Sequence, residues 1–459
     1  MAHNTAVAAD HNAPPVTRAL AEFVAGHPSQ GWGADVESAA RLTFLNWAGC
    51  AIGASRHPTL EAALAAVQEL APSAQATILG RDERVDMAGA ALLNGITSHT
   101  FDFDDTHLRT IIHPAGPVAS AALALAEHRG LSGRALLDAL VLGVDVECRV
   151  GNALYPDHYD RGWHITGSTG MLGAAAACAR LLGLDAGRTA MALGIAASQP
   201  IGVREQFGTM TKPFHPGGAA RAGLMSALMA RHGYTASARA LEAPRGLMQT
   251  YSTKCDWSEI SDALGTRFEI AANTYKPFAC GIVIHPSIDG CAQLAAAHKL
   301  TGTDIERIDI RVHSLVLELT GKKTPRNGLE AKFSVFHACA AGILYGQAGE
   351  AEFDDAVVAD PAVIAVRDRV HATVDPAIDE AAADVTITCR DGRKLHVLVA
   401  AAIGSLQRPM TAPDLARKFH GLVDPVLGAA RAATLVDACA GLATCADVRG
   451  FTAQARATA

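Results

Sequence analysis

The chain has 459 residues, of which 49% are hydrophobic, 19% are charged and only 5% are aromatic. Its formal net charge of −7 at pH 7 lacks the basic excess that a nucleic-acid-binding face requires. Its longest apolar stretch, residues 114–126, is interrupted by Gly116 and Ser120 and is too short to cross a bilayer. We therefore expect neither nucleic acid nor a membrane as a partner.

The N-terminus, residues 1–15, contains no Lys or Arg and no apolar run of the kind found in a secretory signal. We expect these residues to form a mobile tail. The ten cysteines are scattered along the chain, and none belongs to a Cys-x-x-Cys pair. In a large chain without an export signal, this pattern indicates reduced and mostly buried thiols, so we expect a cytoplasmic enzyme.

A helical pattern extends from Val16 to about Arg231. Asp35 is placed to cap a helix in which Phe44 and Trp47 lie on one apolar face. Abundant Ala favours helices that pack closely. Further helices, separated by Gly or Pro, are predicted over residues 119–127, 133–144, 170–182 and 219–232, followed by a connection over residues 233–246.

After residue 267 the apolar residues alternate, as in half-exposed strands. Ile308, Ile310 and Val312 alternate with charged residues, and Asp391-Gly392 joins two alternating runs, which predicts a hairpin with a two-residue type I′ turn. From Pro409 the helical pattern returns. The predicted fold class is mainly α: a large all-helical domain formed by both chain ends (residues 1–267 and 406–459) with a smaller inserted α+β lid domain (residues 268–405). A cleft between two such domains is a common place for a ligand.

An acidic and histidine-rich patch stands out in this apolar chain. Asp102-Phe103-Asp104-Asp105-Thr106 is followed by His107 and by His113-Pro114, and such groups are costly to bury unless they are paired. An imidazole with a carboxylate partner is the usual general acid/base near neutral pH. A solvated loop with a capping aspartate is the structural alternative. A metal site is the other alternative, but the absence of His-x-x-x-His spacing argues against it.

A second patch joins histidines and lysines to stretches rich in Pro and small residues. His164 precedes Thr166-Gly167-Ser168-Thr169, where backbone N–H groups at a helix start attract carboxylates; the alternative is an N-cap cluster with an incidental His. Lys212 lies between apolar residues in a loop stiffened by Pro213 and Pro216, and a substrate carboxylate would supply its counter-charge. Lys276 and His285 repeat the pattern, whereas Cys280 has no neighbouring base and is predicted to be inert.

In this order, these stretches resemble the MmgE/PrpD family, which includes 2-methylcitrate dehydratase, cis-aconitate decarboxylase and iminodisuccinate epimerase. The resemblance also covers Asn94-Gly95, residues 241–246, Lys276-Pro277-Phe278 and residues 408–411. It implies a homodimer of helical domains, each with an α+β lid, a site at the domain junction, and no metal or organic cofactor.

The resemblance also places individual residues. Where the decarboxylase branch keeps its active-site residues, this chain has Asp102, Thr106, His113, His164, Lys212 and Lys276, although its interval between Thr106 and His113 is one residue longer. This chain has Gly281 where that branch has a His, and His337 where that branch and the dehydratase relatives have a Tyr. The second change replaces a proton donor of pKa about 10 with one of about 6.5. Together the changes indicate a substrate other than cis-aconitate.

The family's common step is proton transfer at a carbon next to a carboxylate, which needs a base and cations aimed at that carboxylate. We expect His113, oriented by Asp102, and His164 to exchange protons, with His337 as a second acid/base. We expect the substrate carboxylates to be bound by Lys212, Lys276, Thr106, Thr166 and His285. The predicted function is a citrate-type dehydratase, followed by a dicarboxylate epimerase and then a decarboxylase. A non-catalytic carboxylate-binding protein would have no need to bury His113, His164 and Lys212.

Overall fold

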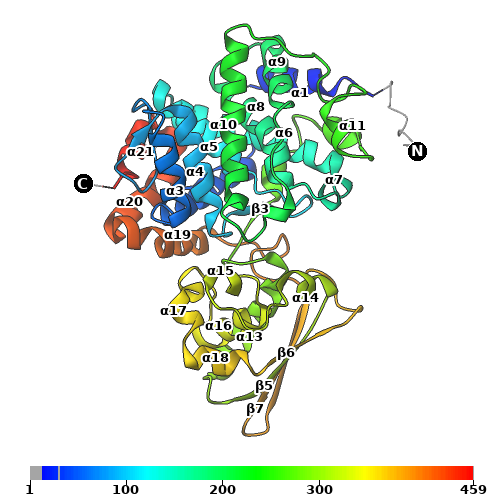
Figure 1. The fold of residues 1–459 in the computed structure, drawn as a ribbon, viewed down its shortest axis with the longest axis vertical. Helices are drawn as coiled ribbons and strands as arrows, with labels where there is room; N and C mark the ends of the chain where they lie inside the picture. Colours follow the sequence, from blue (N-terminus) through cyan, green and yellow to red (C-terminus); the bar gives the residue numbers. More distant parts are fainter. Residues whose placement is uncertain (1–12, 29–31, 458–459) are drawn as a thin grey trace. The chain divides into compact units, whose positions relative to one another are not determined.

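The computed structural model describes residues 13–28 and 32–457, and the chain divides into two compact units. The helical unit comprises Met1–Thr100, Asp104–Asn273 and Ala412–Ala459, and the α+β unit comprises Phe101–Phe103 and Thr274–Thr411. In Figure 1 the blue to green helices and the orange to red C-terminal helices belong to the helical unit. Residues 1–12 of the predicted tail lie outside the described residues.

The helical unit is built almost entirely from helices, which confirms the mainly α fold class. Its helices are α1 (Val16–Gly26), α2 (Ala34–Gly53), α3 (Pro58–Gln68), α4 (Met87–Thr100), α5 (Ala115–Arg129), α6 (Gly133–Leu154), α7 (Asp157–Asp160), α8 (Ile165–Leu181), α9 (Ala186–Ala196), α10 (Thr211–Arg231), α11 (Leu247–Tyr251), α12 (Ser258–Ser261), α19 (Ala412–Leu427), α20 (Ala429–Ala440) and α21 (Arg449–Gln454). Its shorter elements are β1 (Ala76–Thr77), β2 (Arg84–Val85), β3 (Asp105–His107), η1 (Arg204–Gln206), η2 (Glu269–Ala272) and η5 (Leu442–Thr444).

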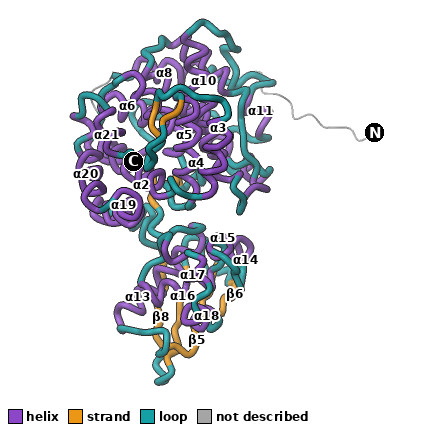
Figure 2. The backbone as a smooth tube through the Cα atoms, turned by 60° about the vertical axis from the view of Figure 1, so that its left-hand side comes forward, coloured by secondary structure: helices purple, strands orange, loops and turns teal. Residues whose placement is uncertain are grey.

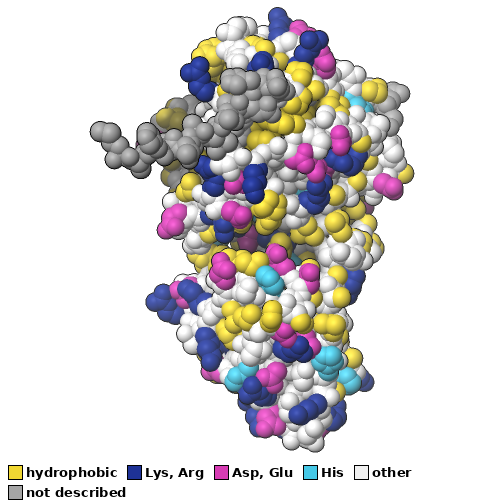
Figure 3. Space-filling model, turned by 90° about the vertical axis from the view of Figure 1, so that its right-hand side faces the viewer, with side chains coloured by type: hydrophobic (Ala, Val, Ile, Leu, Met, Phe, Trp, Pro, Cys, Tyr) yellow, Lys and Arg dark blue, Asp and Glu magenta, His cyan; other side chains and the backbone are white. Residues whose placement is uncertain are grey.

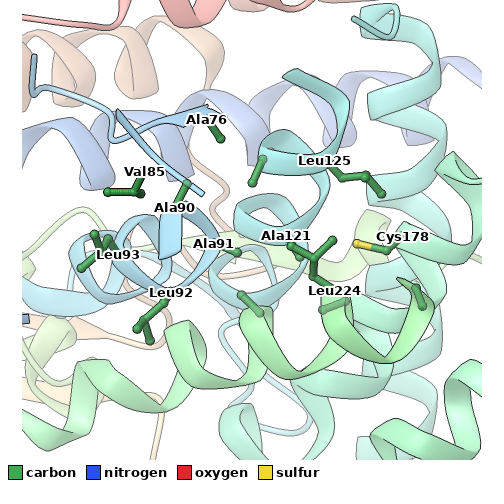
Figure 4. Close-up of a cluster of buried hydrophobic side chains, with 14 of the residues drawn as sticks. Ala76, Val85, Ala90, Ala91, Leu92, Leu93, Ala121, Leu125, Cys178 and Leu224 are labelled. Atoms are coloured by element: carbon green, nitrogen blue, oxygen red, sulfur yellow. The ribbon is translucent and has the colours of Figure 1, made fainter. Parts of the chain in front are cut away.

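Helix α8 lies at the centre of this unit and packs against α5, α6, α9 and α10. Its first fifteen residues are all buried, and most of them are Ala, Gly, Ser or Thr. A Cβ on Gly173 would lie 2.7 Å from the carbonyl oxygen of Gly143 in α6, so the two helices touch through their backbones. Figure 4 shows a neighbouring part of the core, where Ala90, Ala91 and Ala121 lie among larger aliphatic side chains. Small residues thus provide the close helix packing expected from the composition.

Helix α10 begins at Thr211, whereas the sequence predicted a loop up to residue 218. Pro213 falls in the first turn, where a missing N–H costs little, and Pro216 removes one hydrogen bond farther along. Contact with α4 outweighs that loss: a Cβ on Gly217 would lie 2.3 Å from the carbonyl oxygen of Leu92. The helix therefore follows tertiary packing and overrides the local breakers. For the same reason α5 and α8 begin earlier, and α6 ends later, than predicted.

The α+β unit contains a four-stranded sheet in the order β6-β5-β7-β8. Strands β5 and β6 are parallel, and the other two pairs are antiparallel. Helices α13 and α16 contact these strands, and Figure 2 distinguishes the helices and strands by colour. Its elements are β4 (Asn273–Tyr275, beginning in the helical unit), η3 (Ile282–Ile284), α13 (His285–His298), β5 (Ile305–Val312), α14 (Ser314–Thr320), α15 (Gly328–Ala331), α16 (Val335–Tyr345), η4 (Ala351–Phe353), α17 (Asp355–Val358), α18 (Pro361–Arg367), β6 (Val370–Val374), β7 (Ala383–Cys389) and β8 (Lys394–Val399).

The predicted hairpin is the β7–β8 pair, but its turn differs from the prediction. Only Gly392 has a positive φ, of 88°, and the N–H of Cys389 donates to the carbonyl oxygen of Arg393 at 2.8 Å. Cys389 and Arg393 are therefore the last paired residues, and the three residues between them, 390–392, form the turn, with Gly392 in the left-handed position of a bulge. The alternation in β5 is confirmed, since Ile308, Ile310 and Val312 are buried.

Two exclusions from composition can be compared with the structure. Within residues 13–28 and 32–457, no helix is both long and apolar enough to cross a bilayer. On the face drawn in Figure 3, acidic and basic side chains are interspersed and form no single-sign patch.

The close contact of α10 with α4 predicts that Gly217→Ala lowers the free energy of unfolding by about 1–3 kcal/mol, because the added methyl group meets backbone that cannot yield. Gly421→Ala in α19 is the matched control, since nothing lies within 4 Å of its Cβ position. The control should be neutral or stabilise by up to about 1 kcal/mol. Denaturant unfolding followed by circular dichroism measures both values, and equal stabilities would contradict the packing explanation.

Candidate functional site

Four histidines from separate parts of the helical unit form a buried cluster, which we call the histidine cluster: His99, His113, His164 and His215. Their exposed fractions are 1%, 5%, 2% and 3%, respectively. The ring centroids of His99 lie 4.7 Å from His113 and 5.7 Å from His164, and those of His164 and His215 are 5.1 Å apart. The structure thus brings the predicted His113 and His164 together, with two further imidazoles beside them.

The buried Asp104 carboxylate connects two members of the cluster. Its Oδ2 lies 2.7 Å from Nδ1 of His99, and its Oδ1 lies 3.5 Å from Nδ1 of His113. Because a carboxylate accepts, the His99 Nδ1–H donates to it. His99 was missed in the sequence because it lies near the end of the apolar helix α4. Its only signal was Asp104 five residues later, across the helix end.

The orientation of His113 is set by its neighbours in the helical unit. Its Nδ1 donates to the carbonyl oxygen of Asp105 at 2.7 Å, and its backbone N–H donates to Oγ1 of Thr166 at 3.0 Å. Oγ1 of Thr106 lies 3.4 Å from the same Nδ1. Thr106 and Thr166, expected to bind substrate, are therefore placed to position His113. The orienting role expected for Asp102, which belongs to the α+β unit, stays a prediction.

A tight turn lies between Thr106 and His113. The N–H of His107 donates to the carbonyl oxygen of Ile112 at 2.8 Å, while Ile111 adopts a φ of 59°. Positive φ is rare for a β-branched residue, so this turn is strained. His107 is held by Thr110 at 2.8 Å and by Glu269 at 3.1 Å, which identifies it as a structural residue.

The Lys212 ammonium lies near His164 and His215, at the other end of the histidine cluster. His164 is the N-cap of α8, and its Nδ1 lies 2.9 Å from Nδ1 of His215. Nζ of Lys212 lies 5.5 Å from the ring centroid of Phe207, whose edge faces His164. Burial, together with nearby groups that include the Lys212 ammonium, holds the pKa of His164 well below 6.5 and lowers that of His215 to about 4. Both imidazoles are therefore neutral at pH 7 and can accept a proton.

The predicted backbone anion site at the start of α8 is not supported. The N–H groups of Gly167 and Ser168 both donate to the carbonyl oxygen of His164, at 2.9 and 3.2 Å. Because both N–H groups already donate to the carbonyl oxygen of His164, they do not bind a substrate carboxylate. The expectation of substrate-binding N–H groups was therefore wrong for Gly167 and Ser168. Side chains, rather than these N–H groups, remain to bind a carboxylate.

Two further buried carboxyl groups lie near the cluster. Burial and the adjacent Asp104 raise the pKa of Asp105 to about 7, although its Oδ2 accepts from the N–H of Ala115 at 3.1 Å and from Nδ2 of Asn273 at 2.7 Å. Burial also raises the pKa of Glu147 in α6 well above its ordinary value. Neither oxygen of Glu147 has a hydrogen-bond partner among the described residues, so this group is protonated.

The remaining predicted site residues lie in the α+β unit. Nζ of Lys276 donates to Oδ1 of Asp102 at 2.9 Å and to its carbonyl oxygen at 3.0 Å. Asp102 has a φ of 53°, in the left-handed region that Asp adopts more readily than most residues. Nε2 of His285 lies 3.3 Å from the carbonyl oxygen of Cys280. Lys276, expected to bind a substrate carboxylate, therefore already has a carboxylate partner.

His337 and Cys280 are both buried in the α+β unit. Nε2 of His337 lies 2.9 Å from the carbonyl oxygen of Glu352, and its Nδ1 has no hydrogen-bond partner among the described residues. Burial lowers the pKa of His337, so its imidazole is neutral at pH 7. Burial raises the pKa of the Cys280 thiol to about 12, which confirms that it is inert.

Three members of the histidine cluster are close enough together to hold a metal ion. One ring nitrogen from each of His99, His113 and His164 lies within 4.8 Å of the other two. No residue spacing in the sequence predicts such a set, because the three residues come from the end of α4, the loop before α5 and the start of α8. Only the fold brings them together.

Two family models match the chain: the MmgE/PrpD N-terminal domain over residues 18–260 and the MmgE/PrpD C-terminal domain over residues 278–442. A cis-aconitate decarboxylase-like protein, oryM, of Aspergillus oryzae is 28% identical over 450 residues, 90% of this chain and 92% of its own. Human cis-aconitate decarboxylase is 28% identical over 375 residues, 76% of each chain. The 2-methylcitrate dehydratase of Cupriavidus necator is 30% identical over 149 residues, 29% of this chain and 31% of its own.

The shifted pKa values predict opposite effects of pH on stability. In the unfolded chain His215 has a pKa near 6.5, whereas in the folded chain its pKa is about 4. Between these pH values only the unfolded state binds the proton, so the stabilising contribution of His215 is lost as pH falls from 6.5 to 4. Asp105 has a pKa of about 7 in the folded chain and near 3.8 in the unfolded chain. Between these pH values only the folded state binds the proton, so the stabilising contribution of Asp105 is lost as pH rises from 3.8 to 7.

His215→Gln and Asp105→Asn separate the two effects. The free energy of unfolding of the wild type minus that of His215→Gln should rise from pH 4 to pH 6.5. The same difference for Asp105→Asn should fall over pH 4 to 7. Denaturant unfolding at a series of pH values measures both curves, and two flat curves would show that neither group is buried as described.

Proposed function

Because the chain belongs to the MmgE/PrpD family, as its motifs predicted, we propose that it is a lyase that moves a proton at a carbon next to a carboxylate of a small di- or tricarboxylic acid. Its relatives are named as decarboxylases and dehydratases, which are lyases. The observation that carries the proposal is the histidine cluster, in which buried imidazoles lie beside the Lys212 ammonium.

The chemistry requires a base at the carbon and a positive charge at the carboxylate. Removal of the proton places negative charge on the carboxylate oxygens, and Lys212 is the cation that stabilises it. His113 donates its Nδ1–H to Asp105, so its Nε2 lone pair is the base. Asp104, 3.5 Å from Nδ1, stabilises the positive charge that His113 acquires.

We place dehydration first among the reactions. The C–H electron pair forms the new C=C bond, the C–O bond breaks, and the hydroxyl leaves as water after receiving a proton. His113 takes the proton from the carbon and, once protonated, can return it to the leaving hydroxyl. His164, which is neutral at pH 7, is a second proton acceptor on a separate element. The departures from the decarboxylase branch at Gly281 and His337 support a substrate other than cis-aconitate.

Decarboxylation is the second candidate, because the cis-aconitate decarboxylase-like relative matches along 90% of this chain, whereas the dehydratase matches along 29%. In that reaction the C–C bond to carbon dioxide breaks, and an imidazole delivers a proton to the carbon left behind. Roles for Asp102, Lys276, His285 and His337 in either reaction stay predictions, as do the homodimer, the cytoplasmic location and the independence from cofactors.

Incubation with candidate tricarboxylic and dicarboxylic acids in deuterated water distinguishes the reactions by NMR and mass spectrometry. Dehydration gives an alkene, decarboxylation gives carbon dioxide and deuterium at the protonated carbon, and epimerisation gives deuterium in an unchanged skeleton. We expect an alkene from a β-hydroxy acid. A chain that changes none of the acids would contradict the proposal and favour a non-catalytic binding protein.

His113→Asn tests the base directly. We expect turnover and deuterium incorporation to fall by about 10²- to 10⁴-fold, because a positioned acid/base is lost. His232→Asn is the matched control, since this exposed histidine lies at the C-cap of α10 in the same unit. Circular dichroism checks that both variants fold. Normal incorporation by a folded His113→Asn would remove His113 from the mechanism.

A further inference from the structure

We infer that His99, His113 and His164 form a binding site for a divalent transition-metal ion, best suited to Zn²⁺, and that occupancy of this site inhibits the enzyme. The first support is proximity, because one ring nitrogen of each residue lies within 4.8 Å of the other two. The second is burial, since none of the three is more than 5% exposed. Buried imidazoles that converge from three elements are a common zinc ligand set.

The outer hydrogen bonds have the pattern that metal-binding histidines show. Nδ1 of His99 donates to Asp104 at 2.7 Å, and Nδ1 of His113 donates to the carbonyl oxygen of Asp105 at 2.7 Å. Nδ1 of His164 lies 2.9 Å from Nδ1 of His215, which can accept its proton. The partners of His99 and His113 therefore favour the tautomer with the proton on Nδ1 and the lone pair on Nε2, and His164 has the same tautomer when its Nδ1 donates to His215.

One ring nitrogen of the proposed site, Nε2 of His99, is buried and has no hydrogen-bond partner among the described residues. A buried polar atom of this kind is costly unless something binds it. This unsatisfied nitrogen belongs to a ring whose centroid lies 4.7 Å from that of His113 and 5.7 Å from that of His164.

The ligand set favours zinc over the harder cations. Three imidazoles with an open fourth position suit Zn²⁺, whereas Mg²⁺ and Ca²⁺ prefer oxygen ligands. Zn–N bonds of about 2.0–2.1 Å place tetrahedral ligands about 3.3–3.4 Å apart. Because the three nitrogens lie within 4.8 Å of one another, no pair has to close by more than about 1.5 Å to reach this spacing. The negative charge of Asp104 favours the ion, and the positive charge of Lys212 opposes it.

Inhibition follows from competition for the same lone pairs. A metal ion on Nε2 of His113 and His164 prevents these nitrogens from accepting a proton from substrate. This consequence rests on the proposed function, whereas metal binding itself does not. Because the metal ion inhibits the enzyme and takes no part in the reaction, activity should survive exhaustive chelation.

Cobalt provides a direct readout that needs no substrate. The full chain, freed of metal with a chelator and dialysed, is titrated with Co²⁺ and followed by absorption spectroscopy. We expect ligand-field bands that saturate at one equivalent, without a thiolate-to-cobalt band, because all three protein ligands are nitrogen. Zn²⁺ should displace the cobalt. Bands that do not saturate at one equivalent, or a thiolate band, would overturn the site.

Variants locate the site. His99→Gln should abolish the one-equivalent signal, and Asp104→Asn should weaken binding by about 10- to 100-fold, because it removes the outer hydrogen bond to a ligand. His232→Gln, on the exposed C-cap of α10, should bind as the wild type does. X-ray absorption of the zinc-loaded wild type shows the imidazole ligands even if a variant misfolds. Unchanged binding by a folded His99→Gln would overturn the site.

The two proposals fail separately. Zn²⁺ should stop deuterium incorporation in the wild type at the concentration that displaces cobalt. If no acid is turned over but the cobalt signal behaves as expected, the proposed function fails and the metal site stands. If turnover occurs and Zn²⁺ neither binds at one equivalent nor inhibits it, the metal site fails and the proposed function stands.

Discussion

The need to pair buried carboxylates between α4 and α5 determines most of the structure around the site. Asp104 and Asp105 are both fully buried in an apolar helical unit, where an unpaired charge would be very costly. Oδ2 of Asp104 accepts from the imidazole of His99, and Oδ2 of Asp105 accepts from the N–H of Ala115 and the amide of Asn273. These bonds fix the end of one helix, the start of the next and the orientation of His113 between them.

The arrangement costs stability at several positions, which is typical of functional sites. Ile111 is held at a positive φ two residues before His113, at a cost of about 1–3 kcal/mol. Glu147 is buried without a hydrogen-bond partner among the described residues. His164 and His215 are kept neutral by burial and neighbouring charge. The surrounding Ala- and Gly-rich packing supplies the stability that holds these groups in place.

The parts of the fold that depend on local pattern could be predicted from the sequence. Alternation identified β5 and the β7–β8 hairpin, and the polar residues in an apolar chain identified His113, His164 and Lys212. The start of α10 could not be predicted, because contact between Gly217 and α4 overrides two prolines. His99 could not be predicted as a site residue, because an apolar helix conceals it and only the fold brings it to Asp104 and His164.

The central claim is that this hydrogen-bond network leaves Nε2 of His99 and His113 as lone pairs inside the histidine cluster. Nitrogen-15 NMR of the full chain with labelled histidine, assigned with single His→Gln variants, measures the tautomer of each ring. At pH 7 we expect His99 and His113 to carry the proton on Nδ1 and a lone pair on Nε2. Protons on Nε2 of both rings would contradict the base, the metal site and the role of the buried carboxylates.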